Sequence, residues 1–270
     1  LPIFGLTTVC RKIAERRRPR PEAFIAQAYE YGDRFEYDFG EVHLELGGKF
    51  TKLFMAVMVA CASGYRYALL YDSQRADVFA DSQVRFFEHM GGCFREGVYD
   101  NMRNVVSKFV GRSEKELSPA LLRLAAYYGF RVNVTNCYAG NEKGTVESAV
   151  KAVRNAAFAS DWQFADAAAA QAHLDAVLAE MNAGCPVEDE RAALSPRRPP
   201  YEVADIRPGA LVDKYSCVRV DKVSYSVPDY LVGARVTVKA YPGEVVVLAG
   251  GEEVARHARS REAGAMVLEL

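Results

Sequence analysis

The chain has 270 residues, of which 50% are hydrophobic and 26% charged, with a formal net charge of -1. This length allows a sizeable buried core and predicts two domains, and the composition is typical of a globular protein. The longest strongly apolar stretch, residues 53–62, is too short to cross a bilayer, and no secretory signal pattern precedes it.

The six cysteines form no CxxC pair and have no histidine at zinc-ligand spacing, so we expect reduced thiols in a cytoplasmic protein. Leu1 begins the chain inside a helical pattern, and we interpret the sequence as a fragment of a longer protein. A basic run follows at residues 11–20. It is either a solvated linker or an arm that contacts DNA phosphates through Arg16, Arg17, Arg18 and Arg20.

After a helix expected at residues 21–31, the segment 34–45 alternates apolar and polar positions. Phe35, Tyr37 and Phe39 share one face of this predicted strand, and Glu36 and Asp38 share the other. The pair Gly47-Gly48 predicts a hairpin turn. The continuous apolar run 54–62 predicts a strand buried on both faces, and residues 65–71 predict a third strand.

Four helices and two further strands are predicted downstream. Helical spacing covers residues 77–90, 118–128, 144–158 and 165–182, and strands are predicted at 94–99 and 130–134, whereas 102–112 are weakly patterned. The resulting order, three antiparallel strands followed by βα crossovers, predicts an α/β fold with a mixed five-stranded sheet. This order is similar to that of the ribonuclease H-like fold.

The composition changes near residue 185, where several prolines and many charges predict a linker. Five short strands follow at about 211–219, 224–227, 235–240, 244–249 and 253–257, which predicts a small all-β barrel. We therefore expect four regions: the end of an N-terminal DNA-binding region with a basic linker at 1–28, a ribonuclease H-like catalytic core at 29–184, a proline-rich linker at 185–208 and a small β-barrel domain at 209–260.

Three carboxylates belong to three different predicted elements: Asp38 lies inside the alternating strand, Asp100 follows the strand 94–99, and Glu147 lies where the helix 144–158 begins. Taken singly, they would also suit an exposed strand position, a turn and a solvated helix face. Together they can converge at one edge of the sheet. Such a cluster suits hard divalent cations, and two such ions catalyse in-line displacement at phosphorus.

Basic residues share the helical face of Glu147, because Lys143, Lys151 and Arg154 stand at i−4, i+4 and i+7 from it. They would either form ion pairs on an exposed helix or bind DNA phosphates beside the carboxylates. The segment 140–145 lacks the glycine spacing of a phosphate-binding loop, and no HExxH, GxSxG or GxGxxG motif occurs.

The blocks Tyr37-Asp38-Phe39-Gly40, Val98-Tyr99-Asp100-Asn101 and Lys143-Gly144-Thr145-Val146-Glu147 resemble the catalytic blocks of DDE transposases. They resemble most closely the IstA transposases of the insertion sequence 21 family, as does Tyr127-Tyr128-Gly129-Phe130. The predicted barrel is similar to the C-terminal domain of phage Mu transposase. The loop before Lys143 departs from this pattern, because it lacks the prolines typical of the family.

This resemblance implies that Asp38, Asp100 and Glu147 hold two Mg²⁺ ions, for which Mn²⁺ can substitute, and that the protein cleaves transposon ends and joins them to target DNA. It also implies a dimer or larger assembly and an IstB-like AAA+ ATPase as partner. Two alternatives are a ribonuclease H-like nuclease that only hydrolyses nucleic acid, and an inactive transposase-derived protein that only binds DNA.

Overall fold

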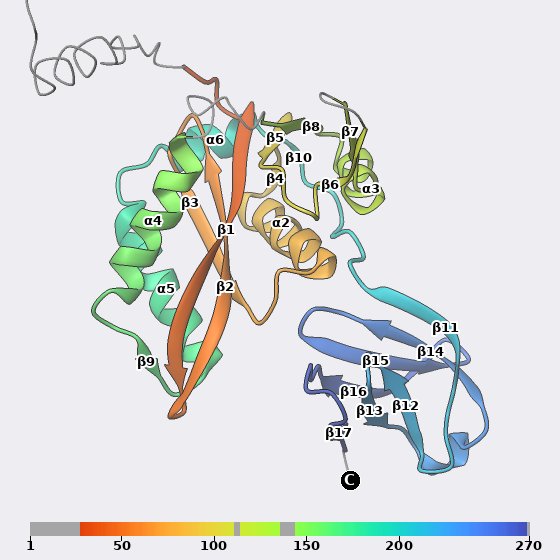
Figure 1. Cartoon of the computed structure of the whole chain (residues 1–270). Helices are drawn as coiled ribbons and strands as arrows, with labels where there is room; N and C mark the ends of the chain where they lie inside the picture. The colour runs from red at the N-terminus through yellow and green to blue at the C-terminus, as the bar shows by residue number, and fades with distance from the viewer. Residues whose placement is uncertain (1–27, 111–113, 136–143, 269–270) are drawn as a thin grey trace, which may run out of the picture.

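A mixed β-sheet organises the first part of the chain (Figure 1). The computed structural model describes residues 28–110, 114–135 and 144–268. Strands β1 (Arg34–Leu46), β2 (Lys49–Ala60) and β3 (Arg66–Tyr71) form an antiparallel meander, and β5 (Glu96–Tyr99) and β8 (Arg131–Val134) continue the sheet in parallel. The strand order is β3-β2-β1-β5-β8, with the short β9 (Gln163–Phe164) added to β1. The predicted ribonuclease H-like order is confirmed.

Local turn chemistry explains where the first strands end. Gly47 and Gly48 have φ values of 56° and 82°, so both take the left-handed conformation that a tight two-residue hairpin turn requires. The register places Leu46 opposite Lys49. The predicted hairpin is therefore present at the predicted residues.

Helices cover both faces of the sheet. Helices α2 (Ala76–Met90) and α3 (Pro119–Tyr128) share one hydrophobic core with Phe35 and Tyr37. Helices α4 (Gly144–Phe158) and α5 (Ala167–Met181) share a second core with Val42 and Leu44 (Figure 1). Because successive residues of a strand point to opposite faces, β1 contributes side chains to both cores.

Two regions differ from the prediction. The weakly patterned stretch after Asp100 forms a hairpin of β6 (Val106–Val110) and β7 (Glu114–Leu117). The helix expected at 21–31 lies largely outside the described residues, and residues 28–33 are not helical.

The stretch expected to be a linker contains helix α6 (Val187–Ala193), followed by β10 (Ser195–Pro196), which pairs with β4 (Gly92–Cys93). Helix α6 carries Glu190, which is fully buried and accepts backbone N–H groups from two other segments. This long-range anchor holds the segment against the sheet, and nothing in its local sequence pattern indicates it.

The C-terminal part consists of two open sheets. Strands β11 (Asp205–Leu211), β14 (Arg235–Ala240), β15 (Glu244–Ala249) and β16 (Glu252–Ala258) form one sheet. Strands β12 (Cys217–Val220), β13 (Val223–Ser226) and β17 (Met266–Val267) form the other, and the 3-10 helix η1 (Asp229–Leu231) lies between β13 and β14. Both sheets bury a shared valine-rich core.

The predicted small barrel is therefore wrong, because the sheets are open: β11 and β16 are the unjoined edges of the four-stranded sheet. Two small sheets packed face to face bury the apolar side chains without closing the hydrogen-bond ladder.

Ion pairs join the C-terminal part to the first part. Arg259, whose side chain is 2% exposed, pairs with Asp77 of α2 and with Asp221, both at 2.8 Å. Arg261 pairs with Asp72 at 2.6 Å. These contacts connect the first turn of α2 and the loop before it with the segment that follows β16.

Candidate active site

The pairing of β1 with β5 brings Asp38 and Asp100 together. The parallel register ends at Tyr37 opposite Tyr99, and Asp38 and Asp100 are the next residues on the two strands. Neighbouring strands lie about 4.8 Å apart, and residues that pair in a parallel ladder point to the same face. Both side chains are partly buried. The Cα atoms of Asp38 and Asp100, which are 62 positions apart in the sequence, are therefore neighbours on adjacent strands.

Backbone N–H groups orient both carboxylates. Asp38 Oδ1 accepts a hydrogen bond from the N–H of Phe39 at 2.8 Å, and Asp100 Oδ1 accepts one from the N–H of Asn101 at 2.7 Å. The Asn101 side-chain amide donates to the carbonyl oxygen of Thr135, which follows β8. The ends of β5 and β8 are thus tied together beside Asp100.

A buried aromatic layer supports these strands from the opposite face. The fully buried Tyr37 hydroxyl shares a 2.9 Å hydrogen bond with Ser82, and the Tyr99 hydroxyl donates to Gln83 at 2.6 Å. Burial raises the pKa of both tyrosines above the ordinary value. Both therefore stay neutral, and they hold the strands firmly against α2.

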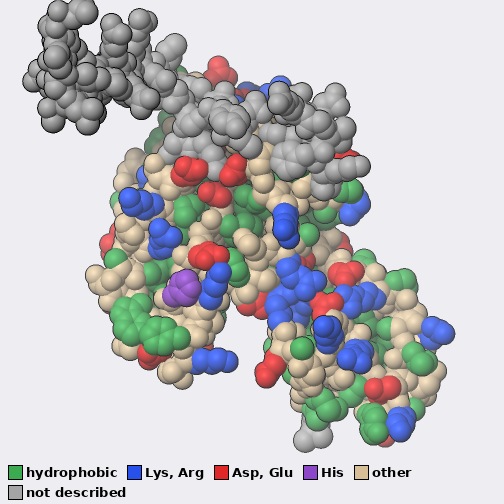
Figure 2. Space-filling view, viewed as in Figure 1, with side chains coloured by type: hydrophobic (Ala, Val, Ile, Leu, Met, Phe, Trp, Pro, Cys, Tyr) green, Lys and Arg blue, Asp and Glu red, His purple; other side chains and the backbone are tan. Residues whose placement is uncertain are grey.

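Helix α4 lies against the face of β1 that carries Asp38. The carboxylate of Glu36 accepts the N–H of Val146, and a side chain at Gly40 would meet Val150. Glu147 lies between these two helix contacts, in the first turn of α4, and its side chain is exposed. Figure 2 shows acidic side chains gathered on this face of the molecule.

The described residues contain no group of three His, Cys, Asp or Glu side chains close enough to hold a metal ion. The adjacent positions of Asp38 and Asp100 nevertheless provide the oxygen donors that Mg²⁺ prefers, and Glu147 would supply a third carboxylate from α4. The donor chemistry of these residues fits the expected ions.

The predicted DNA-contacting residues have different surroundings. Lys151 is exposed on α4, whereas Arg154 is partly buried and donates to the carbonyl oxygen of Glu41 on β1 at 3.5 Å. Basic side chains are visible over α4 in Figure 2. Lys143 and the predicted basic contacts Arg16, Arg17, Arg18 and Arg20 lie outside the described residues.

Sequence reasoning placed Glu36 on the same face as Asp38 but assigned it no role. The structure buries it to 1% exposure at the N-terminus of α4. One signal for this role was available in the sequence: Glu36 lies on a strand face that a predicted helix should cover. A buried charge requires a partner, so Glu36 could have been expected to bind a group of that helix.

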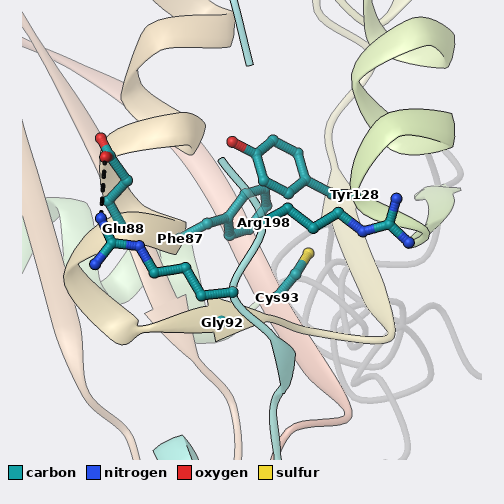
Figure 3. Close-up of a pocket in the computed structure, with 7 residues that line it drawn as sticks. Phe87, Glu88, Gly92, Cys93, Tyr128 and Arg198 are labelled. Carbon is teal, nitrogen blue, oxygen red and sulfur yellow. Dashed lines mark ion pairs between the residues drawn. The ribbon is translucent and has the colours of Figure 1, made fainter. Parts of the chain in front are cut away.

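A small pocket lies elsewhere, where the segment after α6 crosses α2 and α3 (Figure 3). Arg197 pairs there with Glu88 at 3.5 Å, and Arg198 donates to the carbonyl oxygen of Tyr127 at 2.7 Å. None of the three predicted carboxylates lines this pocket. We interpret it as part of the packing of this segment.

Known proteins resemble both the C-terminal part of the chain and most of its length. Residues 195–269 match the family described as Mu transposase, C-terminal domain. A transposase of Aminobacter aminovorans is 28% identical over 87% of this chain and 48% of its own length. The transposase of insertion sequence element IS21 from Pseudomonas aeruginosa is 28% identical over 52% of this chain and 36% of its own length.

A chain of the simian T-cell lymphotropic virus intasome aligns over 93% of this chain and 88% of its own, at 12% identity and a TM-score of 0.47. The chain spans about half the length of the first transposase. No helix among the described residues is long and apolar enough to cross a membrane. A transposase for insertion sequences IS1326/IS1353 from Pseudomonas aeruginosa is 25% identical over 87% of this chain and 48% of its own length. The resemblance to insertion-sequence transposases, the IS21 transposase among them, is confirmed.

Proposed function

We propose that this chain carries the catalytic core of a DDE transposase that cleaves the ends of an insertion sequence and joins them to target DNA. The observation that carries the proposal is the β1–β5 register, which puts Asp38 and Asp100 at adjacent positions on one face of the sheet. Helix α4, which bears Glu147, packs against the same face. The similarity to insertion-sequence transposases supports the same reaction class.

Asp38, Asp100 and Glu147 would hold two Mg²⁺ ions, or Mn²⁺ in their place. When bound, such ions activate the attacking oxygen and stabilise the leaving oxygen of an in-line displacement at phosphorus. The protein's own contribution is to orient the carboxylates. The N–H groups of Phe39 and Asn101 do this for the two aspartates. The aromatic layer beneath them restrains the strands that carry them.

The proposed substrates are transposon-end DNA and target DNA. Lys143, Lys151 and Arg154 would contact backbone phosphates beside the carboxylates, and the basic run 11–20 would do so before the core. Joining two ends requires a dimer or larger assembly. An IstB-like AAA+ ATPase is the partner that the resemblance implies.

The test is a set of isosteric substitutions in the full-length protein. Asp38→Asn, Asp100→Asn and Glu147→Gln should each reduce end cleavage and joining below detection in Mg²⁺ and leave the circular dichroism spectrum unchanged, because each removes a charge that holds an ion. Glu45→Gln, on the same strand β1, is the matched control and should keep wild-type activity.

Products from labelled transposon ends and a target plasmid separate the alternatives. Hydrolysis without joining would indicate a nuclease. Near wild-type activity of any of the three variants would remove that residue from the site.

A further inference from the structure

A buried carboxylate lies two residues before Asp38 on the same face of β1. Glu36 is 1% exposed, and its Oε2 accepts a hydrogen bond from the backbone N–H of Val146 at 3.0 Å. Val146 belongs to the first turn of α4, where backbone N–H groups have no acceptor within the helix. A negative charge at this end also interacts favourably with the helix dipole. Glu36 therefore anchors the beginning of α4 to β1.

A second contact anchors the helix on the other side of Asp38. A Cβ atom added at Gly40 would lie 2.7 Å from Cγ1 of Val150, so α4 approaches the β1 backbone as closely as a glycine allows. Residues 36, 38 and 40 point to the same face of β1. The helix thus contacts the strand two residues before and two residues after Asp38. Glu147 lies between the two helix residues that make these contacts.

We propose that Glu36 is a positioning residue for Glu147. By accepting a hydrogen bond from the Val146 N–H, it fixes the position and the rotation of the first turn of α4 relative to Asp38. This role rests on the proposed function of Glu147. Glu36 is not a further ion ligand, since it is buried and one of its oxygens already accepts a backbone N–H.

Two conservative substitutions distinguish the effect of side-chain length, which allows the hydrogen bond to Val146, from the effect of the negative charge. Glu36→Gln keeps an acceptor oxygen at the same distance and removes the charge. Glu36→Asp keeps the charge, but its side chain is one methylene too short to reach Val146. If Glu36 is a positioning residue, Glu36→Gln should keep activity and Glu36→Asp should lose it. If Glu36 is an ion ligand, Glu36→Asp should keep activity and Glu36→Gln should lose it. Glu36→Ala removes both properties, and Glu45→Ala on the same strand is the matched control.

Backbone hydrogen exchange tests the contact without any activity measurement. In the full-length protein, exchange of the peptide containing residues 144–150 should be about tenfold faster in Glu36→Asp and Glu36→Ala, because the hydrogen bond that the Val146 N–H donates to residue 36 is lost. Glu36→Gln and Glu45→Ala should match the wild type. Unchanged exchange in Glu36→Asp would overturn the proposal, even if Glu36→Ala fails to fold.

Single-turnover end cleavage tests the consequence. A displacement of a catalytic group by about 1 Å costs on the order of 100-fold in rate. Glu36→Asp should therefore lower the single-turnover rate constant at saturating DNA by about that factor and leave the DNA concentration for half-maximal rate unchanged. Glu36→Gln should stay within about threefold of the wild type. If Glu36→Gln is as inactive as Glu147→Gln while exchange is unchanged, Glu36 acts at the ions and the positioning role is wrong. If the wild-type protein itself cleaves no DNA, the proposed function fails, and the exchange data still decide whether Glu36 anchors α4.

Discussion

Replacing Glu190 with Ala should destabilise the first part of the chain severely. Glu190 lies on α6 and is fully buried. Its Oε1 accepts the N–H of Gly32 at 2.7 Å, and its Oε2 accepts the N–H of Ser63 at 2.9 Å. One side chain thus joins α6 to the residues before β1 and to the turn between β2 and β3.

The magnitude follows from these two contacts. A hydrogen bond to a charged group contributes about 1.5–3 kcal/mol, and Ala would leave two buried N–H donors without Glu190 as acceptor. We expect Glu190→Ala to lower the free energy of unfolding by about 3–5 kcal/mol. Glu190→Gln keeps one acceptor oxygen but turns an NH₂ group toward the other donor, so about 2 kcal/mol is expected.

Urea denaturation followed by tryptophan fluorescence measures this loss. The chain has one tryptophan, Trp162, which stacks on Phe50 with ring centroids 5.5 Å apart in the same part of the chain. The matched control is Glu188→Ala on the same helix, which loses only an exposed pair with Arg191 and should stay within about 0.5 kcal/mol of the wild type. An unfolding free energy of Glu190→Ala within about 1 kcal/mol of the wild type would refute the reasoning.

Three further predictions concern the surroundings of the fold and the site. Gly32→Ala should lower the free energy of unfolding, measured by urea denaturation, by about 2 kcal/mol or more. Gly32 has a φ of 73°, and a Cβ atom there would meet the Ala193 carbonyl, so an unfolding free energy equal to that of the wild type would contradict this. The double variant Lys151→Glu with Arg154→Glu should weaken binding to transposon-end and random duplexes alike, and lower the salt-dependence slope by about 0.9 per lost phosphate contact; an unchanged slope would exclude this helix face from DNA binding. Hydrogen bonds from Arg207, and then from Arg259, lower the pKa of Asp221 from 3.8 to about 2. Its ionised form is therefore favoured in the folded protein. The stability advantage of the wild type over Asp221→Asn should be complete above about pH 4 and disappear as the pH falls toward 2, and a difference in melting temperature that does not vary with pH would contradict that assignment.

Several elements follow from the sequence because their causes are local. The alternation of β1 predicts which side chains enter which core, since a strand has a period of two residues. Helices α2 and α3 end at Gly91 and Gly129, whose φ values of 80° and 82° are readily adopted by glycine. Asp38, Asp100 and Glu147 were selected on local patterns too: Asp38 lies inside an alternating strand, Asp100 follows a strand, and Glu147 lies in the first turn of a helix.

The tertiary structure alone decided how these elements meet. The parallel β1–β5 register makes Asp38 and Asp100 neighbours, and the Glu36–Val146 hydrogen bond sets α4 against β1. The open sheets of the C-terminal part and helix α6 also depend on partners far away in the sequence. A local pattern states which face of an element is apolar or charged. It does not specify the distant backbone group that will pair with that face, and these long-range hydrogen bonds are what hold the candidate site together.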